Sequence, residues 1–88
     1  MPLPLTMYGA TDCEDTQHVR ERLTEWRIPF REVNIDHDAA AEQFVIFING
    51  GQRSTPTLVF GDGAHKTILT EPSDVELQQT LRETGYDI

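Results

Sequence analysis

The spacing of apolar residues in the first half of the chain predicts a strand, a helix and a second strand. Residues 4–8 alternate between apolar and polar side chains, which is typical of a short strand ending at Gly9. Residues 15–26 contain no Gly or Pro, and their apolar side chains recur at the spacing of one helix face, at Val19, Leu23 and Trp26. Alternation returns over residues 30–35. A strand, a helix and a strand in this order predict two parallel strands joined by a right-handed crossover.

The second half of the chain predicts a helix, a hairpin and a final helix. Residues 38–48 fit a helix whose first residue, an Asp, can cap it, and a Gly-rich segment follows. Residues 57–60 form a short apolar run typical of a buried strand, and residues 66–69 can return as its antiparallel partner. A Ser can cap the last helix over residues 73–84. The side chains expected to face the core from these two helices are Phe44, Phe47 and Ile48, and Val75, Leu77 and Leu81.

The order of these elements, β-α-β-α-β-β-α, predicts an α/β fold with one sheet and helices packed on it. The chain has 88 residues, and we expect residues 1–88 to form a single domain. Apolar residues make up 38% of the chain, which is enough for a core and excludes a disordered tail.

The charge balance of the chain narrows its partners and its location. Seven Lys and Arg against fifteen Asp and Glu give a net charge of −8. Such an acidic surface argues against nucleic acid and anionic membranes as partners. No apolar run approaches the roughly 20 residues of a membrane span, and residues 1–4 lack the basic start of a signal peptide. We therefore expect a cytoplasmic protein that binds neither nucleic acid nor membranes.

Cys13 is the only cysteine, which excludes an intramolecular disulfide and a metal site built from cysteines alone. It lies between the first predicted strand and the first predicted helix, where free N–H groups and the helix dipole stabilise a thiolate. The alternative is a small buried side chain without chemistry. Asp12, Glu14 and Asp15 favour an exposed sulfur, but their charges oppose the thiolate. We expect them to hold the thiolate fraction below what the helix terminus alone would give.

Pro56 follows a Gly-rich loop and directly precedes the third predicted strand. A proline at such a place can follow a cis peptide bond, and Thr55 before it can offer backbone N–H and C=O groups to an extended ligand. On frequency alone an ordinary trans proline is favoured, because only about 5% of such bonds are cis in folded proteins.

Several segments match a known family in order and spacing. They are Tyr8–Cys13, Val33–Asp36, Ala39–Glu42, Phe44–Val45, Asn49–Thr57, Phe60–Gly63 and Leu69–Ser73. With them the chain resembles a glutaredoxin-like member of the thioredoxin fold, most of all the mycoredoxin branch, over about residues 5–84. The resemblance implies a thioredoxin-like fold, in which three helices flank a four-stranded mixed sheet, and a cis bond before Pro56.

The motif at the cysteine departs from the pattern of this family. Glutaredoxins usually carry Cys-x-x-Cys, whose second cysteine resolves the mixed disulfide, whereas this chain reads Cys13-Glu14-Asp15-Thr16. Thr16 cannot form a disulfide, so the chain is of the monothiol type. The motif also differs from the Cys-Gly-Phe-Ser of the branch that handles iron–sulfur clusters. Ala10-Thr11-Asp12 lacks the Lys that many glutaredoxins have before the cysteine.

The resemblance implies a monothiol thiol–disulfide oxidoreductase that reduces mixed disulfides between proteins and a low-molecular-weight thiol. Cys13 would attack the mixed disulfide, Thr16 would donate a hydrogen bond to its thiolate, and a second small-thiol molecule would release Cys13. The residues expected to bind the substrate are Gln52, Arg53, Thr55, Pro56, Ser73 and Asp74. Glutathione or mycothiol would be the co-substrate, with no bound cofactor or metal. Proteins carrying mixed disulfides would be the partners of a monomer.

Two other functions stay open at this point. The acidic loop around Cys13 and the lost second cysteine would suit a binding module for a basic partner, although the intact ligand loop Gln52–Thr57 opposes this reading. A dimer could also bridge an iron–sulfur cluster through two copies of Cys13 and two small thiols. The three histidines, His18, His37 and His65, lack the spacing of metal ligands, so we expect them at the surface.

Overall fold

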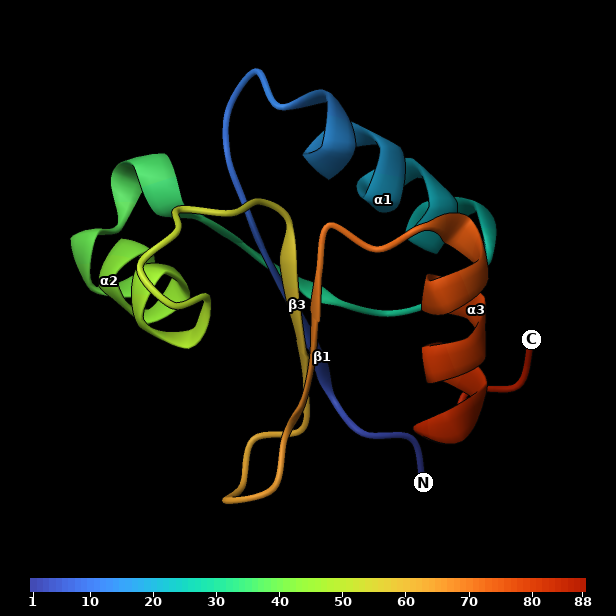
Figure 1. Ribbon diagram of the computed structural model, residues 1–88. Helices are drawn as coiled ribbons and strands as arrows, with labels where there is room; N and C mark the ends of the chain where they lie inside the picture. The colour runs from blue at the N-terminus through green and yellow to red at the C-terminus, as the bar shows by residue number, and fades with distance from the viewer.

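The chain folds into one four-stranded mixed sheet with helices on both faces, and the computed structural model describes all 88 residues (Figure 1). The elements in chain order are β1 (Leu5–Gly9), α1 (Glu14–Glu25), β2 (Arg31–Asn34), the 3-10 turn η1 (Ile35–His37), α2 (Ala39–Ile48), β3 (Thr57–Phe60), β4 (Thr67–Thr70) and α3 (Asp74–Glu83). The strands lie in the order β2-β1-β3-β4, with β1 and β2 parallel and the other pairs antiparallel. The predicted fold class and element order are confirmed.

Two hydrophobic cores hold the helices on the sheet. Figure 1 shows α1 and α3 on one face and α2 on the other. Alternate residues of β1 and β3 point to the same face, because side chains alternate along a strand. The main core, on the side of α1 and α3, consists of Leu5, Met7, Val19, Leu23, Ile28, Leu58, Phe60, Leu77, Leu81 and Tyr86. A smaller core under α2 is formed by Ile35, Ala41 and Val45.

The three α-helices begin in different ways. Asp38 caps α2 by accepting a hydrogen bond from the backbone of Ala41, and Ser73 caps α3 in a reciprocal capping box with Glu76. Cys13 stands at the N-cap of α1 without any side-chain capping bond, so N–H groups of the first turn remain available to the sulfur. None of these helices is long and apolar enough to cross a membrane.

Three details of the sequence prediction are wrong. Phe47 and Val75, both expected in the core, are 82% and 71% exposed. The inward faces of α2 and α3 are set by Val45 and Leu77, and a residue two positions away points to nearly the opposite side of a helix. Ile35 does not extend β2 either, because the chain turns into η1 at this residue, where its side chain is buried in the smaller core.

Candidate active site

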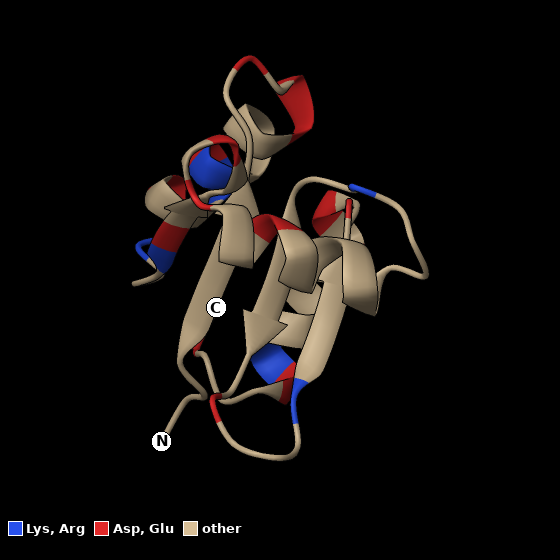
Figure 2. Cartoon of the chain, turned by 90° about the vertical axis from the view of Figure 1, so that its left-hand side faces the viewer, with Lys and Arg blue, Asp and Glu red and all other residues tan.

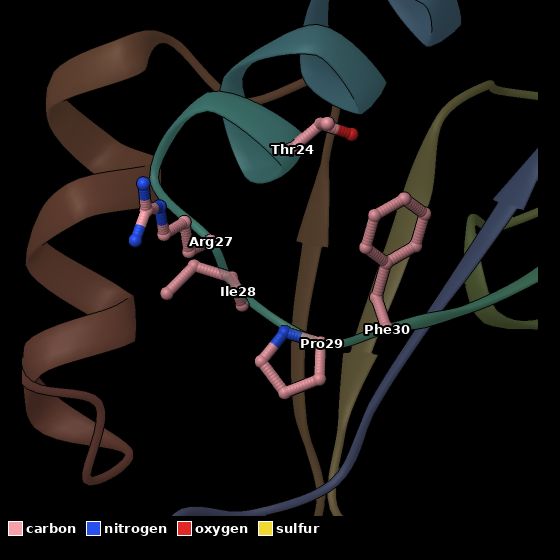
Figure 3. A pocket seen from close by; sticks show the side chains of 5 residues that line it. All are labelled: Thr24, Arg27, Ile28, Pro29 and Phe30. Atoms are coloured by element: carbon pink, nitrogen blue, oxygen red, sulfur yellow. The ribbon is translucent and has the colours of Figure 1, made fainter.

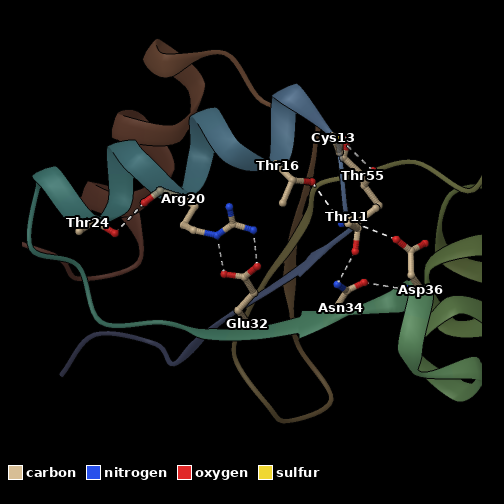
Figure 4. Close-up of polar contacts among 10 residues, drawn as sticks. Thr11, Cys13, Thr16, Arg20, Thr24, Glu32, Asn34, Asp36 and Thr55 are labelled. Atoms are coloured by element: carbon tan, nitrogen blue, oxygen red, sulfur yellow. Dashed lines mark hydrogen bonds and ion pairs between the residues drawn. The ribbon is translucent and has the colours of Figure 1, made fainter.

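Cys13 lies between the end of β1 and the start of α1, opposite the loop that leads into β3. Its sulfur is 3.3 Å from Thr55 Oγ1 and 3.7 Å from Thr55 O, although the two residues are 42 positions apart (Figure 4). The Thr55–Pro56 bond is cis, as the family resemblance implies, and Pro56 is buried. The structure therefore brings three of the predicted site residues into one place.

The surroundings of the sulfur lower the pKa of Cys13 below its ordinary value. Burial is the largest single influence, and it raises this pKa. The hydroxyls of Thr16 and Thr55 and the backbone N–H groups of Thr16 and Asp15 stabilise the thiolate and together outweigh burial. A lowered pKa provides more thiolate, the nucleophilic form, at neutral pH.

Thr16 joins the first turn of α1 to the end of β1. Its side chain is fully buried, and its Oγ1 accepts a hydrogen bond from the Ala10 N–H at 3.4 Å. A Cβ atom added at Gly9 would lie 2.4 Å from Thr16 Cγ2, which is too close for any side chain. Because the oxygen is the acceptor for Ala10, its own proton stays available for the sulfur of Cys13. The sequence suggests the hydrogen-bond role of Thr16; the only signal for its packing role is the glycine at the strand end.

Arg53, expected to bind the ligand, is already held by two carboxylates. Its Nε donates to Glu42 Oε2 at 2.6 Å, and its Nη2 pairs with Asp36 Oδ1. Asp36 Oδ2 accepts a hydrogen bond from the Thr11 N–H at 2.8 Å. The hydrogen bond to Glu42, followed by that to Asp36, raises the pKa of Arg53, and Arg53 in turn lowers the pKa of Asp36. The neighbouring Gln52 is exposed.

Sequence reasoning missed Asp36 and Glu42 as parts of this site. Asp36 has a usable signal, because the parallel strands β1 and β2 end at the same edge of the sheet, so the residues that follow them meet. Glu42 lies in the first turn of α2 and has no such signal, since nothing in its own segment points to Arg53.

The start of α3 lies beside α1 and is tied to the proline loop. Asp74 Oδ1 lies 2.7 Å from Nε2 of His18, which belongs to α1. The Ser73 hydroxyl accepts a hydrogen bond inside its own helix start. The Glu71 N–H donates to Pro56 O at 2.9 Å and thereby fixes the chain before α3. Ser73 and Asp74 thus flank the site, and both side chains already have hydrogen-bond partners within the protein.

The surface around Cys13 is acidic and open. Asp12, Glu14 and Asp15 are exposed, and Figure 2 shows acidic residues gathered in the loop and first helical turn at the top of the molecule. The larger of two hollows, of about 590 Å³, lies where α1 ends and β2 begins and is lined by Thr24, Arg27, Ile28, Pro29 and Phe30 (Figure 3). The second lies at the start of β1. Cys13 lines neither hollow, so its sulfur lies at an open surface.

The histidines expected at the surface are all exposed, and no three His, Cys, Asp or Glu side chains lie close enough to hold a metal ion.

Relatives of the chain identify its family. Residues 5–65 match the family model of the glutaredoxins. Over 77 residues the chain is 40% identical to two proteins from strains of Mycobacterium tuberculosis, named "Putative glutaredoxin MT3292" and "Putative glutaredoxin Rv3198A", and the match covers 88% of each chain. The chain belongs to the glutaredoxin family.

Solved structures confirm the thioredoxin-like fold of this glutaredoxin. The thioredoxin-like protein BC3987 matches it with a TM-score of 0.67 and 26% identity over 88% of this chain and 97% of that one. A target protein from X. campestris, XcR50, matches with a TM-score of 0.64 and 28% identity over 90% of this chain and 96% of that one. Family membership supports thiol–disulfide chemistry with a glutathione-like thiol, and a single cysteine fits the monothiol type.

Proposed function

We propose that this glutaredoxin reduces mixed disulfides between proteins and a low-molecular-weight thiol, using Cys13 alone as the nucleophile. The observation that supports this most directly is the position of the sulfur. It stands at the start of α1, half-buried, 3.3 Å from Thr55 Oγ1, with a lowered pKa. Thr16 takes the place of a resolving cysteine, so the second half of the cycle needs an external thiol.

The reaction runs in two thiol–disulfide exchanges. The Cys13 thiolate attacks the small-thiol sulfur of the mixed disulfide, a bond forms between these two sulfurs, and the protein thiolate leaves and takes up a proton. A second small-thiol molecule, as its thiolate, then attacks the small-thiol sulfur bound to Cys13. This step releases a small-thiol disulfide and restores the Cys13 thiolate. Each cycle consumes one protein mixed disulfide and one free small thiol, and it produces one protein thiol and one small-thiol disulfide.

The substrate-binding residues surround the sulfur from two sides. The backbone N–H and C=O of Thr55, held before Pro56, align the disulfide beside Cys13, with Gln52 and Arg53 on the same loop. Ser73 and Asp74 receive the far end of the small thiol at the start of α3. Arg53 uses two of its five N–H donors on carboxylates and keeps the others for the ligand.

The charges around Cys13 favour mycothiol over glutathione as the small thiol. Arg53 and His18 are both already paired with carboxylates, and the loop around the sulfur adds three acidic side chains. An uncharged, hydroxyl-rich thiol meets less repulsion here than one that carries a net negative charge.

The test is turnover of a peptide mixed disulfide, prepared once with glutathione and once with mycothiol, each with its own thiol as reductant. We expect the wild type to free the peptide thiol faster in the mycothiol series. Cys13→Ser should abolish this catalysed release of the peptide thiol in both series, because no other thiol exists in the chain. A matched control is Glu83→Gln, an exposed residue at the end of α3, which should turn over like the wild type. Undiminished release by Cys13→Ser would contradict the proposal.

We further propose that residues 1–88 act as a single domain, as a monomer in the cytoplasm, with proteins that carry mixed disulfides as its partners. The acidic surface supports the absence of nucleic acid and anionic membranes among them. Sedimentation equilibrium should give about 10 kDa, the mass of one chain, with and without the small thiol.

A binding module for a basic partner is the second candidate function. The observation that favours it is the set of three exposed carboxylates around Cys13. A protein of this kind would bind a basic peptide equally well as wild type and as Cys13→Ser, and neither would reduce the peptide mixed disulfide. An oxidoreductase, by contrast, loses its turnover when Cys13→Ser removes the sulfur.

A further inference from the structure

Asp36 uses its two carboxylate oxygens on two different loops. Oδ2 accepts a hydrogen bond from the Thr11 N–H at 2.8 Å, and Oδ1 pairs with Nη2 of Arg53. Thr11 stands two residues before Cys13, and Arg53 stands two residues before Thr55. One side chain thereby holds the loop that carries the nucleophile and the loop that lies opposite it. Figure 4 shows the contact of Asp36 with Thr11.

The position of Asp36 is itself fixed by the sheet edge on which it stands. Asn34, the last residue of β2, accepts a hydrogen bond from the Asp36 N–H at 2.9 Å through its side-chain oxygen. Its side-chain amide donates to Thr11 Oγ1 at 2.9 Å. Asn34, Asp36 and Thr11 therefore form a closed set of hydrogen bonds, and Arg53 is joined to this set from outside.

The contact between the sulfur and Thr55 depends on how these two loops stand relative to each other. Cys13 and Thr55 are 42 positions apart and two α-helices lie between them, so the contact is not fixed by local chain geometry. The link through Asp36 attaches two residues from Cys13 and two residues from Thr55. It therefore constrains both residues closely, because two residues span at most about 7 Å. Exposed ion pairs contribute little to stability, so positioning rather than stabilisation is the effect expected from this one.

We propose that Asp36 is a positioning residue that holds the Cys13 loop and the Thr55 loop together through Thr11 and Arg53. The part of this proposal that concerns turnover rests on the proposed function. The part that concerns the reactivity of the sulfur does not, because a small alkylating reagent reports it without any substrate.

The decisive measurement is the rate of Cys13 alkylation by iodoacetamide across pH for Asp36→Ala. Removal of a nearby negative charge, taken alone, favours the thiolate and speeds alkylation at pH 7. Loss of positioning loosens the hydrogen bond from Thr55 to the sulfur and slows it. We expect alkylation at pH 7 to slow about threefold, the effect of losing part of one charge-assisted hydrogen bond. Asp36→Asn should fall in between, because its single oxygen can serve Thr11 or Arg53 but not both.

Arg53→Met tests the other end of the link. It should slow alkylation in the same direction, and the double variant of Asp36→Ala and Arg53→Met should be no slower than Asp36→Ala alone, because both changes break one connection. The control is Glu32→Gln, which breaks the ion pair between Arg20 and Glu32. This pair is joined by two hydrogen bonds and lies away from the two loops (Figure 4). Glu32→Gln should leave alkylation unchanged.

The outcomes separate this proposal from the proposed function. In the peptide assay Asp36→Ala should lower kcat/KM about tenfold, as misalignment of a reacting group does. If the wild type shows no turnover but Asp36→Ala slows alkylation, the proposed function fails and the positioning role stands. Alkylation of Asp36→Ala as fast as or faster than the wild type overturns the positioning role, whatever the turnover. If Asp36→Ala loses its far-UV circular dichroism, Asp36→Asn and Arg53→Met decide the same question.

Discussion

The hydroxyl of Thr16 should make a measurable contribution to the reactivity of Cys13. Thr16→Val keeps the branched shape that packs against Gly9 and removes only the hydroxyl. Its oxygen accepts a hydrogen bond from the Ala10 N–H at 3.4 Å. The same hydroxyl is the first of the groups that lower the pKa of Cys13. We expect Thr16→Val to raise this pKa and to slow alkylation at pH 7.

The size of the effect follows from the hydrogen bonds around the sulfur. A hydrogen bond to a charged group contributes about 1.5–3 kcal/mol, and 1.4 kcal/mol corresponds to tenfold in the equilibrium between thiol and thiolate. The sulfur keeps three donors, the Thr55 hydroxyl and two backbone N–H groups, so the lower end of this range applies. A more basic thiolate is also a better nucleophile, with a Brønsted coefficient of about 0.4–0.5, which restores roughly half of the loss on a logarithmic scale. The net decrease at pH 7 is therefore about threefold.

The assay is the alkylation rate of Cys13 from pH 5 to 10, measured for the wild type, Thr16→Val and Thr16→Ser. Thr16→Ser keeps the hydroxyl and removes the methyl group beside Gly9, so it should hold the midpoint of the pH profile while lowering the free energy of unfolding by about 1 kcal/mol. Thr16→Val should shift the midpoint upward. Identical profiles for Thr16→Val and the wild type would refute the hydrogen bond, and a shift in Thr16→Ser alone would assign the effect to packing.

Three further predictions follow, two on the loop of Cys13 and one on the ion pair between Arg20 and Glu32. Thr16→Cys should create a dithiol form with one intramolecular disulfide, because residues three apart share a helix face, and mass spectrometry should detect a loss of about 2 Da on oxidation. Glu14→Gly with Asp15→Tyr should lower the pKa of Cys13 and speed its alkylation near pH 7, with a gap to the wild type that closes at high salt. The pKa of Glu32 is lowered first by its hydrogen bond to Arg20, so this group stabilises the fold above its ordinary pKa and loses that effect as pH falls through its folded value. In acid unfolding below about pH 4.5, Glu32→Gln should therefore show a shallower loss of stability than the wild type.

The elements of the fold were predictable because each has a local signal. Strand alternation, helix periodicity and turn residues lie within a few positions of one another, and the observed boundaries of β1, α1 and β4 differ from the predicted ones by one residue. The predicted caps of α2 and α3 are local in the same sense and are confirmed. Phe47 and Val75 were misplaced because both helices are short, and their apolar residues fit more than one face until the sheet selects one.

The site residues were predictable only where the surrounding segment of sequence carries a local signal for their role. Cys13 at a helix start and Pro56 before a strand have such signals, and the family resemblance connects them. The link from Thr11 through Asp36 to Arg53 has none of this kind, since it joins three segments and rests on side chains that would be ordinary solvated polar groups in isolation. Topology rather than local pattern brings them together, because β1 and β2 run parallel and end at the same edge.

The acidic loop shows that the charges of neighbouring residues alone are a poor guide to the pKa of Cys13. Each exposed carboxylate costs the thiolate on the order of 0.5 kcal/mol at about 8 Å in water, and less in physiological salt. Asp12, Glu14 and Asp15 together therefore oppose it by about as much as one charge-assisted hydrogen bond favours it. Nearby hydroxyl and N–H groups, among them the Thr55 hydroxyl 3.3 Å from the sulfur, lower the pKa of Cys13 despite the acidic loop. Because the carboxylates point into solvent, they can meet a basic segment of a partner without silencing the thiolate, so reactivity and partner choice are set by different atoms of the same loop.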